Sequence, residues 1–229
     1  MSTLYVLATP IGNLQDITLR ALETLKGVDF IICEDTRVTA KLLARYEIQK
    51  SMVCYFQHSR LSRMDEIVAR LVKGENAALV TDAGTPGISD PGGLLIKQIN
   101  QLANQLINII PIPGPCAAVT ALSVSGLPTD KFLFLGFPPH KKGRQKFWTR
   151  LLAAEETVVF YESCHRIIKS LNELSNQLIN QLTNQQRQVV VCRELTKLYE
   201  SVYRGTIDQV LEKVQADPVK GEYVVVVSK

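Results

Sequence analysis

The chain has 229 residues, of which 46% are hydrophobic and 21% charged, which is typical of a soluble globular protein with a sizeable core. No apolar run approaches the roughly 18–20 residues of a membrane helix, and the start of the chain lacks a basic segment, so we expect no membrane span, no signal peptide and a cytoplasmic protein. The net charge is +4, and neither the five cysteines nor the three histidines have the spacing of metal ligands, so we expect reduced, buried thiols and no metal.

Short apolar runs alternate with helical patterns along the first half of the chain. The predicted strands are 4–9, 29–33, 53–56, 77–81 and 108–112. Between them, leucines 19, 22 and 25 share one face of a predicted helix that ends near Gly27, and Ile67 and Leu71 mark another that ends near Gly74. Near-continuous apolar strands predict a mostly parallel sheet covered on both faces.

The second half repeats this alternation with closer turns, which predicts a mixed sheet. Its predicted strands are 132–137, 157–162, 188–194, 200–205 and 222–228. The fold class is therefore α/β, with an N-terminal domain over 1–120, a C-terminal domain over 121–229 and a cleft between them for a small molecule. The similar stretches "NQLANQLIN" (100–108) and "NQLINQLTN" (176–184) are interpreted as solvated helix faces rather than a structural repeat.

Two polar stretches follow the first two strands. In "ATPIGNLQDITLRA" (8–21) the dinucleotide fingerprint GxGxxG is absent and Pro10 removes a backbone donor, so the loop suits a pyrophosphate poorly. It is either a site at a strand end or an ordinary strand–loop–helix turn. In "CEDTRVTAKLL" (33–43) Glu34, Asp35 and Arg37 either cap a helix and pair in solvent, or form a polar cluster that could accept a proton from a hydroxyl.

The stretch "TDAGTPGISDPGG" (81–93) is rich in glycine but carries negative charge. It contains four glycines, two prolines that cannot donate, and the carboxylates of Asp82 and Asp90. A phosphate-binding loop needs free N–H donors and a lysine, so this loop suits instead a ligand with cationic character and hydroxyls, such as S-adenosylmethionine. A structural turn that uses glycine for positive φ explains the same composition.

Paired acids and bases end two strands of the second half, in "FYESCHR" (160–166) and "CRELTK" (192–197), as site residues or as salt bridges between the domains. The positive charge is also uneven: residues 1–128 carry 11 basic and 11 acidic groups, whereas 129–229 carry 15 and 11. The run "HKKGRQKFWTR" (140–150) contains five lysines and arginines and no acid. This asymmetry indicates an anionic partner for the second half.

These motifs occur in order along the chain, together with "IPIPGPCAAVTALSVSGLPTDKFLFLGF". As a set they closely resemble the sequences of the bacterial ribosomal RNA small subunit methyltransferase I family, of the tetrapyrrole methylase superfamily. The resemblance covers essentially the whole chain. It departs at Thr81 and Cys116, where serine is usual, and at Cys164, where proline is common.

The resemblance implies an S-adenosylmethionine-dependent enzyme and a homodimer. The enzyme would methylate the ribose 2′-hydroxyl of cytidine 1402 in 16S rRNA of the 30S subunit. Residues implied to bind the cofactor are Pro10, Thr85, Ile88, Cys116, Ala117, Tyr161, Glu162, Val190 and Glu222.

Residue chemistry adds candidates for the other roles. Glu34, Asp35, Arg37 and Asp82 are the catalytic candidates, with the cluster of the first three favoured as the source of the base. The RNA-binding candidates are Lys141, Lys142, Arg144, Lys146, Arg166 and Lys197. Phe147 or Trp148 could stack on a base, although both also fit the apolar face of a helix with its basic face toward RNA. The alternatives are a tetrapyrrole methyltransferase of the same superfamily and a non-catalytic sensor of an adenine-containing ligand.

Overall fold

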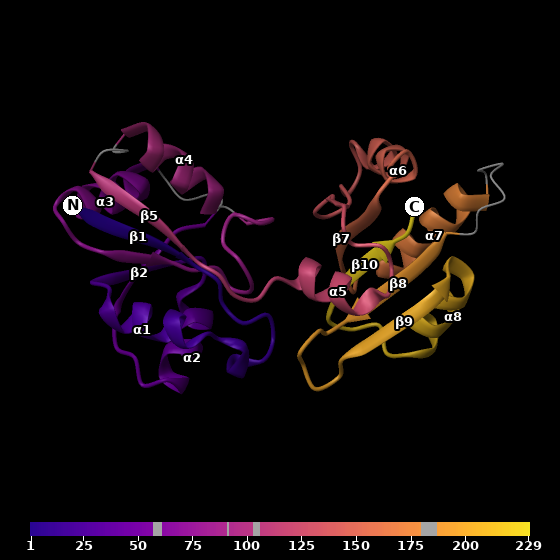
Figure 1. The fold of residues 1–229 in the computed structure, drawn as a ribbon, viewed down its shortest axis with the longest axis horizontal. Coiled ribbons are helices and arrows are strands. Elements are labelled where there is room, and N and C mark those ends of the chain that lie inside the picture. The colour runs from indigo at the N-terminus through magenta and orange to yellow at the C-terminus, as the bar shows by residue number, and fades with distance from the viewer. Residues whose placement is uncertain (57–60, 91, 103–105, 180–186) are drawn as a thin grey trace. The chain divides into compact units, whose positions relative to one another are not determined.

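The computed structural model describes residues 1–56, 61–90, 92–102, 106–179 and 187–229. The chain forms two compact units, Met1–Cys116 and Ala117–Lys229, which Figure 1 shows in indigo to magenta and in pink to yellow. The sequence predicts the boundary after residue 120, whereas the structure divides after Cys116. The difference arises because helix α5 (Ala117–Ser125) packs against strands of the second unit.

The first unit is a five-stranded, fully parallel sheet in the order β3-β2-β4-β1-β5. Its strands are β1 (Ser2–Leu7), β2 (Phe30–Cys33), β3 (Ser51–Cys54), β4 (Ala77–Leu79) and β5 (Ile107–Ile112). Its helices are the 3-10 turn η1 (Leu14–Asp16), α1 (Leu19–Gly27), α2 (Thr36–Arg45), α3 (Leu61–Val72) and α4 (Gly92–Leu102). All five strands predicted in this half are confirmed, as is the parallel sheet.

Alternate residues of each strand face two separate cores, as expected for a sheet covered on both faces. Phe30 and Ile32 of β2 belong to the core beneath α3 and α4, whereas Ile31 and Cys33 belong to the core beneath α1 and α2. Figure 1 shows these helix pairs on opposite sides of the sheet.

The predicted helix faces are confirmed with one exception. Leu25 is fully buried and Leu22 packs on the core, but Leu19 is 79% exposed. Leu19 is the first residue of α1, directly after the Thr18 cap, and Ala21 is the buried residue of that turn. The predicted helix with Ile67 and Leu71 is confirmed as α3, and both side chains are fully buried.

The second unit is a five-stranded mixed sheet in the order β6-β7-β10-β8-β9, in which only β6 and β7 are parallel. Its strands are β6 (Phe132–Phe134), β7 (Thr157–Ser163), β8 (Gln188–Arg193), β9 (Ser201–Thr206) and β10 (Glu222–Val227). Its other helices are α6 (Arg144–Leu152), α7 (Ile167–Ile179) and α8 (Ile207–Ala216). The predicted mixed sheet is confirmed.

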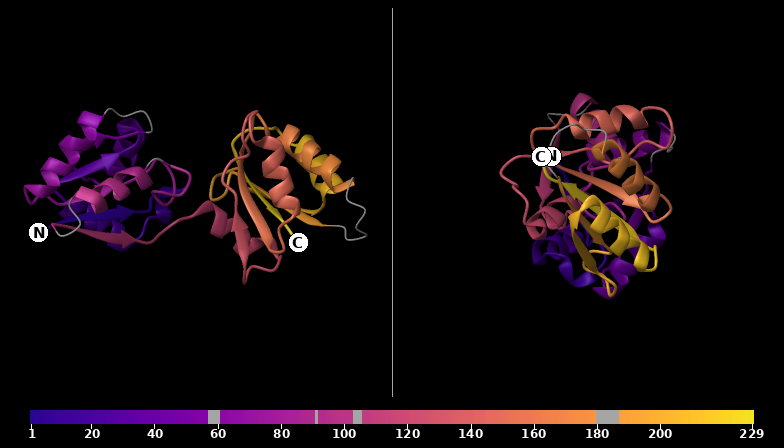
Figure 2. Two further views of the ribbon diagram at one scale, coloured as in Figure 1. Left: turned by 90° about the horizontal axis from the view of Figure 1, so that it is seen from above. Right: turned by 90° about the vertical axis from the view of Figure 1, so that its right-hand side faces the viewer.

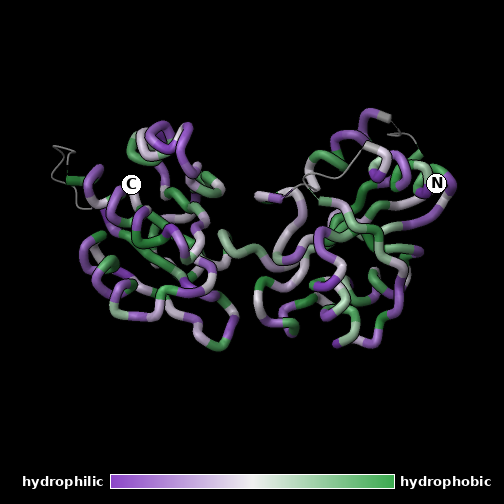
Figure 3. Tube along the Cα trace, turned by 180° about the vertical axis from the view of Figure 1, so that it is seen from behind, coloured by the Kyte–Doolittle hydropathy of each residue, from purple (hydrophilic) through white to green (hydrophobic). Residues whose placement is uncertain are grey.

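Helices α6, α7 and α8 bury their apolar faces on one side of this sheet, and Figure 2 shows them together there. On the other side, α5 contacts β10 and β7, with the small residues Ala118 and Ala121 buried. Figure 3 shows the hydrophobic residues gathered along the inner strands of each unit.

Neither Gln/Asn-rich stretch is fully described: residues 103–105 and 180–184 lie outside the described residues. Within the described ranges no helix is long and apolar enough to cross a membrane. All five cysteines are free thiols, of which Cys33 and Cys192 are buried as predicted, whereas Cys54, Cys116 and Cys164 are only half-buried.

Candidate functional site

The carboxyl end of β4 is a topological switch point of the first sheet. The chain leaves β4 into α4 on one face, while the neighbouring strands β1 and β2 lead into α1 and α2 on the opposite face. Open α/β sheets bind their ligands at such points. The three loops that follow these strands carry the polar stretches singled out in the sequence, so the topology brings them together.

Hydrogen bonds fasten the loop after β1 to the loop after β4. Thr9 and Gly84 exchange two backbone hydrogen bonds, of 2.9 and 3.1 Å, and the Thr9 hydroxyl donates to the carbonyl of Thr81 at 3.0 Å. Gly84 has a φ of +88°, which favours glycine. Pro10 is buried directly beside this bridge. The loop after β1 is therefore part of a built site edge rather than an independent turn.

Glu34 and Asp82 are partly buried carboxylates on adjacent strand ends. Burial raises the pKa of Glu34, and the charge of Asp82 raises it further, while the hydroxyl of Thr81, 3.3 Å from Oε2, lowers it. Burial likewise raises the pKa of Asp82, although the backbone N–H of Asp35 donates to its Oδ1 at 3.1 Å. Both groups therefore hold protons more readily than ordinary carboxylates.

Asp35 has the opposite electrostatic setting. It caps α2 by accepting from the backbone N–H of Arg37 at 2.8 Å, and it forms an ion pair of 2.6 Å with the Arg37 guanidinium. These hydrogen bonds lower the pKa of Asp35 to about 2. The cluster of three thus divides: Arg37 pairs with Asp35, and Glu34 points to the hydroxyl of Thr81 instead.

The glycine-rich loop uses one of its two aspartates to hold itself together. The Asp90 carboxylate accepts from the backbone N–H of Gly87 at 2.8 Å and of Gly92 at 2.7 Å. Asp90 therefore stabilises the loop, which leaves Asp82 as the carboxylate of this loop that is available to a ligand. The hydroxyl of Thr85 donates to Pro115 O at 3.1 Å, and Ile88 is exposed.

The segment after β5 ends the first unit and begins the second. Cys116 is half-buried as the last residue of its unit, and Ala117 opens α5. One residue on, the backbone N–H of Ala118 donates to the hydroxyl of Tyr161 at 3.2 Å. The ring of Tyr161 makes edge contacts with Phe134 and Phe137 at centroid distances of 5.0 and 5.4 Å.

Two residues predicted to bind the cofactor are buried inside the second unit, and a third is ion-paired at its surface. Glu162 is 1% exposed and forms an ion pair of 2.7 Å with Arg166, so this pair lies within one unit and not between domains. Val190 is buried in β8. Glu222 is exposed and pairs with Lys197 at 2.8 Å.

The predicted RNA-binding residues also separate by environment. Lys141, Lys142 and Lys146 are exposed. Arg144 is only 8% exposed because Glu173, Ser170 and Pro139 O bind its guanidinium, so it does not belong to the basic surface.

The aromatic residues of the run 140–150 lie in the core, and two further predicted cations are, like Arg144, engaged in ion pairs. Phe147 and Trp148 are buried, so the interpretation in which they stack on a base is wrong. Arg166 is paired with Glu162, and Lys197 with Glu194 as well as with Glu222.

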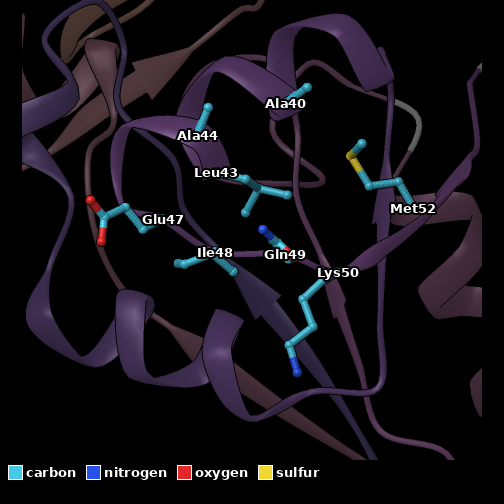
Figure 4. Close-up of a pocket in the computed structure, with 8 residues that line it drawn as sticks. All are labelled: Ala40, Leu43, Ala44, Glu47, Ile48, Gln49, Lys50 and Met52. Atoms are coloured by element: carbon cyan, nitrogen blue, oxygen red, sulfur yellow. The ribbon is translucent and has the colours of Figure 1, made fainter.

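Sequence reasoning did not single out Thr9 and Thr81, whose hydrogen bond joins two loops of the candidate site. Each lies two residues after the end of a strand, which is the signal that could have found it. A hollow elsewhere in the first unit, at the end of α2, contains none of the predicted site residues (Figure 4). It is lined by Ala40, Leu43, Ala44, Glu47, Ile48, Gln49, Lys50 and Met52.

The parallel sheet and the mixed sheet together are the architecture of the tetrapyrrole (corrin/porphyrin) methylases. The sequence model of that family matches residues 3–211. The fold is also that of uroporphyrin-III C-methyltransferase from Thermus thermophilus complexed with S-adenosylhomocysteine, with a TM-score of 0.65 at 14% identity, covering 98% of this chain and 96% of that one.

Relatives of higher sequence identity show to which family of this class the chain belongs. Ribosomal RNA small subunit methyltransferase I of Synechocystis is 44% identical over 100% of this chain and 79% of its own length. The protein of the same name from Escherichia coli O157:H7 is 43% identical over 98% of this chain and 77% of its own length. The chain belongs to the ribosomal RNA small subunit methyltransferase I family of the tetrapyrrole methylases.

Proposed function

We propose that this protein transfers a methyl group from S-adenosylmethionine to the ribose 2′-hydroxyl of cytidine 1402 in 16S rRNA. The observation that carries the proposal is the pair of partly buried carboxylates, Glu34 and Asp82, at the switch point of the first sheet. A ribose hydroxyl is a weak nucleophile, and a carboxylate with a raised pKa is a better proton acceptor than an ordinary one. Family membership supports the same reaction.

The residues at the switch point fit a cationic cofactor. S-adenosylmethionine supplies a methyl group on a sulfonium and carries no phosphate. Burial raises the pKa values of Glu34 and Asp82, and the charge of Asp82 raises that of Glu34 further, as the charge of Asp35 does for Asp82; a nearby positive charge would offset these effects. We propose Pro10 as a contact from the loop after β1, and Thr85 and Ile88 as contacts from the loop after β4. Cys116, Ala117 and Tyr161 are the proposed contacts from the following segment and β7, with the buried Glu162 and Val190 as supports.

Among the catalytic candidates, Asp82 and Glu34 are better bases than Asp35. A carboxylate with a pKa of about 2 holds a proton poorly, and the carboxylate of Asp35 is already engaged by the backbone and side chain of Arg37. We therefore assign Asp35 and Arg37 to positioning: the Asp35 N–H donates to Asp82 and orients its carboxylate. Most of the rate would come from alignment of the hydroxyl with the methyl group.

The exposed lysines 141, 142 and 146 are the proposed contacts to the RNA backbone. Glu222, the first residue of β10, stays a candidate contact to the cofactor. Lys197, which is ion-paired with it, stays a candidate contact to RNA. The proposed substrate is the 30S subunit, the proposed site of action is the cytoplasm, and the proposed assembly is a homodimer, as the family resemblance implies.

Methyl transfer with a radiolabelled cofactor to 30S subunits that lack the modification tests the proposal. We expect label on the ribose of one cytidine. Asp82→Asn and Glu34→Gln should each lower kcat at least about 100-fold if they act as the base or support it. Asp35→Ala should lower kcat less and leave cofactor binding in place.

Three outcomes of this experiment would overturn parts of the proposal. Label on a base, or transfer to a uroporphyrinogen in place of RNA, would refute the reaction. Cofactor binding without any transfer would favour a sensor. An Asp35→Ala enzyme slower than both other variants would return the base to Asp35.

A further inference from the structure

The segment 136–143, "GFPPHKKG", links β6 to α6 and exposes an aromatic ring beside several basic side chains. Phe137 is 48% exposed, and His140, Lys141 and Lys142 are exposed after it. Acidic side chains are absent from this stretch of sequence. An exposed aromatic ring next to lysines is a combination that single-stranded RNA uses for base stacking and phosphate contact.

Pro138 and Pro139 lack N–H groups, so the middle of this segment has no backbone donors. Two guanidiniums hold it through its carbonyls instead. Nη1 of Arg166 donates to Pro138 O at 2.9 Å, and Nη1 of Arg144 donates to Pro139 O at 3.0 Å. The two adjacent carbonyls are thus fixed by two separate side chains.

Both guanidiniums are themselves fixed from the core of the unit. Arg166 pairs with the buried carboxylate of Glu162 at 2.7 Å, and Arg144 pairs with Glu173 at 2.6 Å. Ser170 links the two pairs, because its hydroxyl donates to Glu162 at 2.5 Å and accepts from Nη2 of Arg144 at 2.7 Å. The network runs from β7 and α7 to the segment. A planar guanidinium holds its donors in a fixed fork, so it can set a carboxylate and a carbonyl in one defined arrangement, whereas the single ammonium of a lysine lacks that fork geometry.

We infer that segment 136–143 is an RNA-docking platform, on which Phe137 stacks on an unpaired base and Lys141 and Lys142 contact phosphates. Arg144 and Arg166 are positioning residues that hold the platform in shape and do not contact RNA themselves. The inference rests on the proposed function for the identity of the RNA. It also gives a role to the two arginines of the basic and "FYESCHR" motifs, which are held in ion pairs and not left free in solvent.

The positioning role is tested by Arg166→Lys, which keeps a positive charge for Glu162 but gives up the carbonyl of Pro138. Arg187→Lys is the matched control, because the Arg187 guanidinium also donates to backbone carbonyls in the same unit, at Leu152 O (2.7 Å), Leu151 O (3.4 Å) and Ser228 O (3.3 Å). We expect Arg166→Lys to raise KM for 30S subunits about 3- to 10-fold with kcat and cofactor affinity near wild type. The control should lower Tm without changing KM.

The platform itself is tested by binding to 30S subunits over a range of salt concentrations. Phe137→Leu should weaken binding roughly 5-fold or more with an unchanged salt slope, since stacking releases no counterions. Phe132→Leu is its control, an exposed phenylalanine on β6 of the same unit. Lys141→Ala combined with Lys142→Ala should flatten the salt slope by about 1.4.

These measurements separate the inference from the proposed function. Equal KM changes in Arg166→Lys and Arg187→Lys, or wild-type binding by Phe137→Leu, would overturn the inference while methyl transfer by the wild type stays intact. Absence of methyl transfer by the wild type would overturn the proposed function, and the binding measurements would still show whether the platform holds RNA.

Discussion

Replacement of Glu162 should destabilise the second unit more than any exposed charge does. Its carboxylate is buried, pairs with Arg166 at 2.7 Å, and accepts from the Ser170 hydroxyl at 2.5 Å and from the backbone N–H of Ser163 at 2.9 Å. Glu162→Ala would remove every one of these acceptors and leave Arg166, whose side chain is 17% exposed, without its counter-charge.

Removal of one partner of a buried ion pair costs about 3–5 kcal/mol, which is a large part of the about 5–15 kcal/mol that stabilises a domain. With a urea m-value of about 2 kcal/mol/M, the unfolding midpoint of the unit should fall by about 1.5–2.5 M. Glu162→Gln should cost less, because its one amide oxygen can still accept from either the Ser163 N–H or the Ser170 hydroxyl. Adding Arg166→Met to Glu162→Gln should recover part of the loss, since no unpaired charge is then buried.

Trp148 provides the assay. It is the only tryptophan of the chain, it is 2% exposed in the core of the second unit, and its indole N–H donates to Glu173 at 2.8 Å. Its fluorescence in urea therefore reports the unfolding of this unit alone. Lys169→Met is the control, because Lys169 is 65% exposed and 4.0 Å from Glu173, and we expect it to change stability by less than about 0.5 kcal/mol. A shift below about 1 kcal/mol for Glu162→Ala would refute the reasoning.

Three further substitutions test the site and the fold. Burial raises the pKa of Asp82, so the folded state binds its proton more readily than the unfolded state, and stability falls as pH rises from about 4 through the raised pKa. Asp82→Asn, whose amide oxygen can still accept from the Asp35 N–H, should therefore leave the first unit at least as stable as wild type at pH 7 and lose this advantage below about pH 4, by calorimetry. Gly221→Ala should cost at least about 1–2 kcal/mol in urea, because φ at this position is +88° and an added Cβ would overlap the Glu194 side chain. Thr206→Ala removes the capping box of α8 and should cost about 1 kcal/mol in the same assay.

The fold could be predicted because hydrophobic pattern alone determines most of it. Continuous apolar runs such as Phe30–Cys33 become strands buried on both faces, and the helices between them follow from spaced apolar residues such as Ile67 and Leu71. Helix ends were harder to predict. Leu19 fits the apolar spacing of α1, yet its place in the first turn leaves it exposed.

The roles of the basic residues could not be predicted from composition. Arg144 stands between lysines in the sequence and looks like a member of the same surface, but the partners that bury it, Glu173 and Ser170, come from α7 about 26–29 residues further on. A run of positive charge predicts an anionic partner only for those side chains that the fold leaves in solvent. Lys141, Lys142 and Lys146 meet that condition.

The carboxylates of the first unit show why charge in a motif does not by itself indicate a role. The carboxylate of Asp90 accepts hydrogen bonds from backbone N–H groups of its own loop. The carboxylate of Asp35 accepts from the backbone N–H of Arg37 at the start of α2 and pairs with the Arg37 guanidinium. Such groups hold a loop in shape, and for Asp35 they also lower the pKa, so it makes a poor base. Glu34 and Asp82 lie instead where two strand ends meet. Burial raises both pKa values, and a neighbouring carboxylate raises each further: Asp82 acts on Glu34, and Asp35 acts on Asp82. We therefore expect proton transfer at the proposed site to depend on Glu34 and Asp82, the two carboxylates that the surrounding loops leave least satisfied.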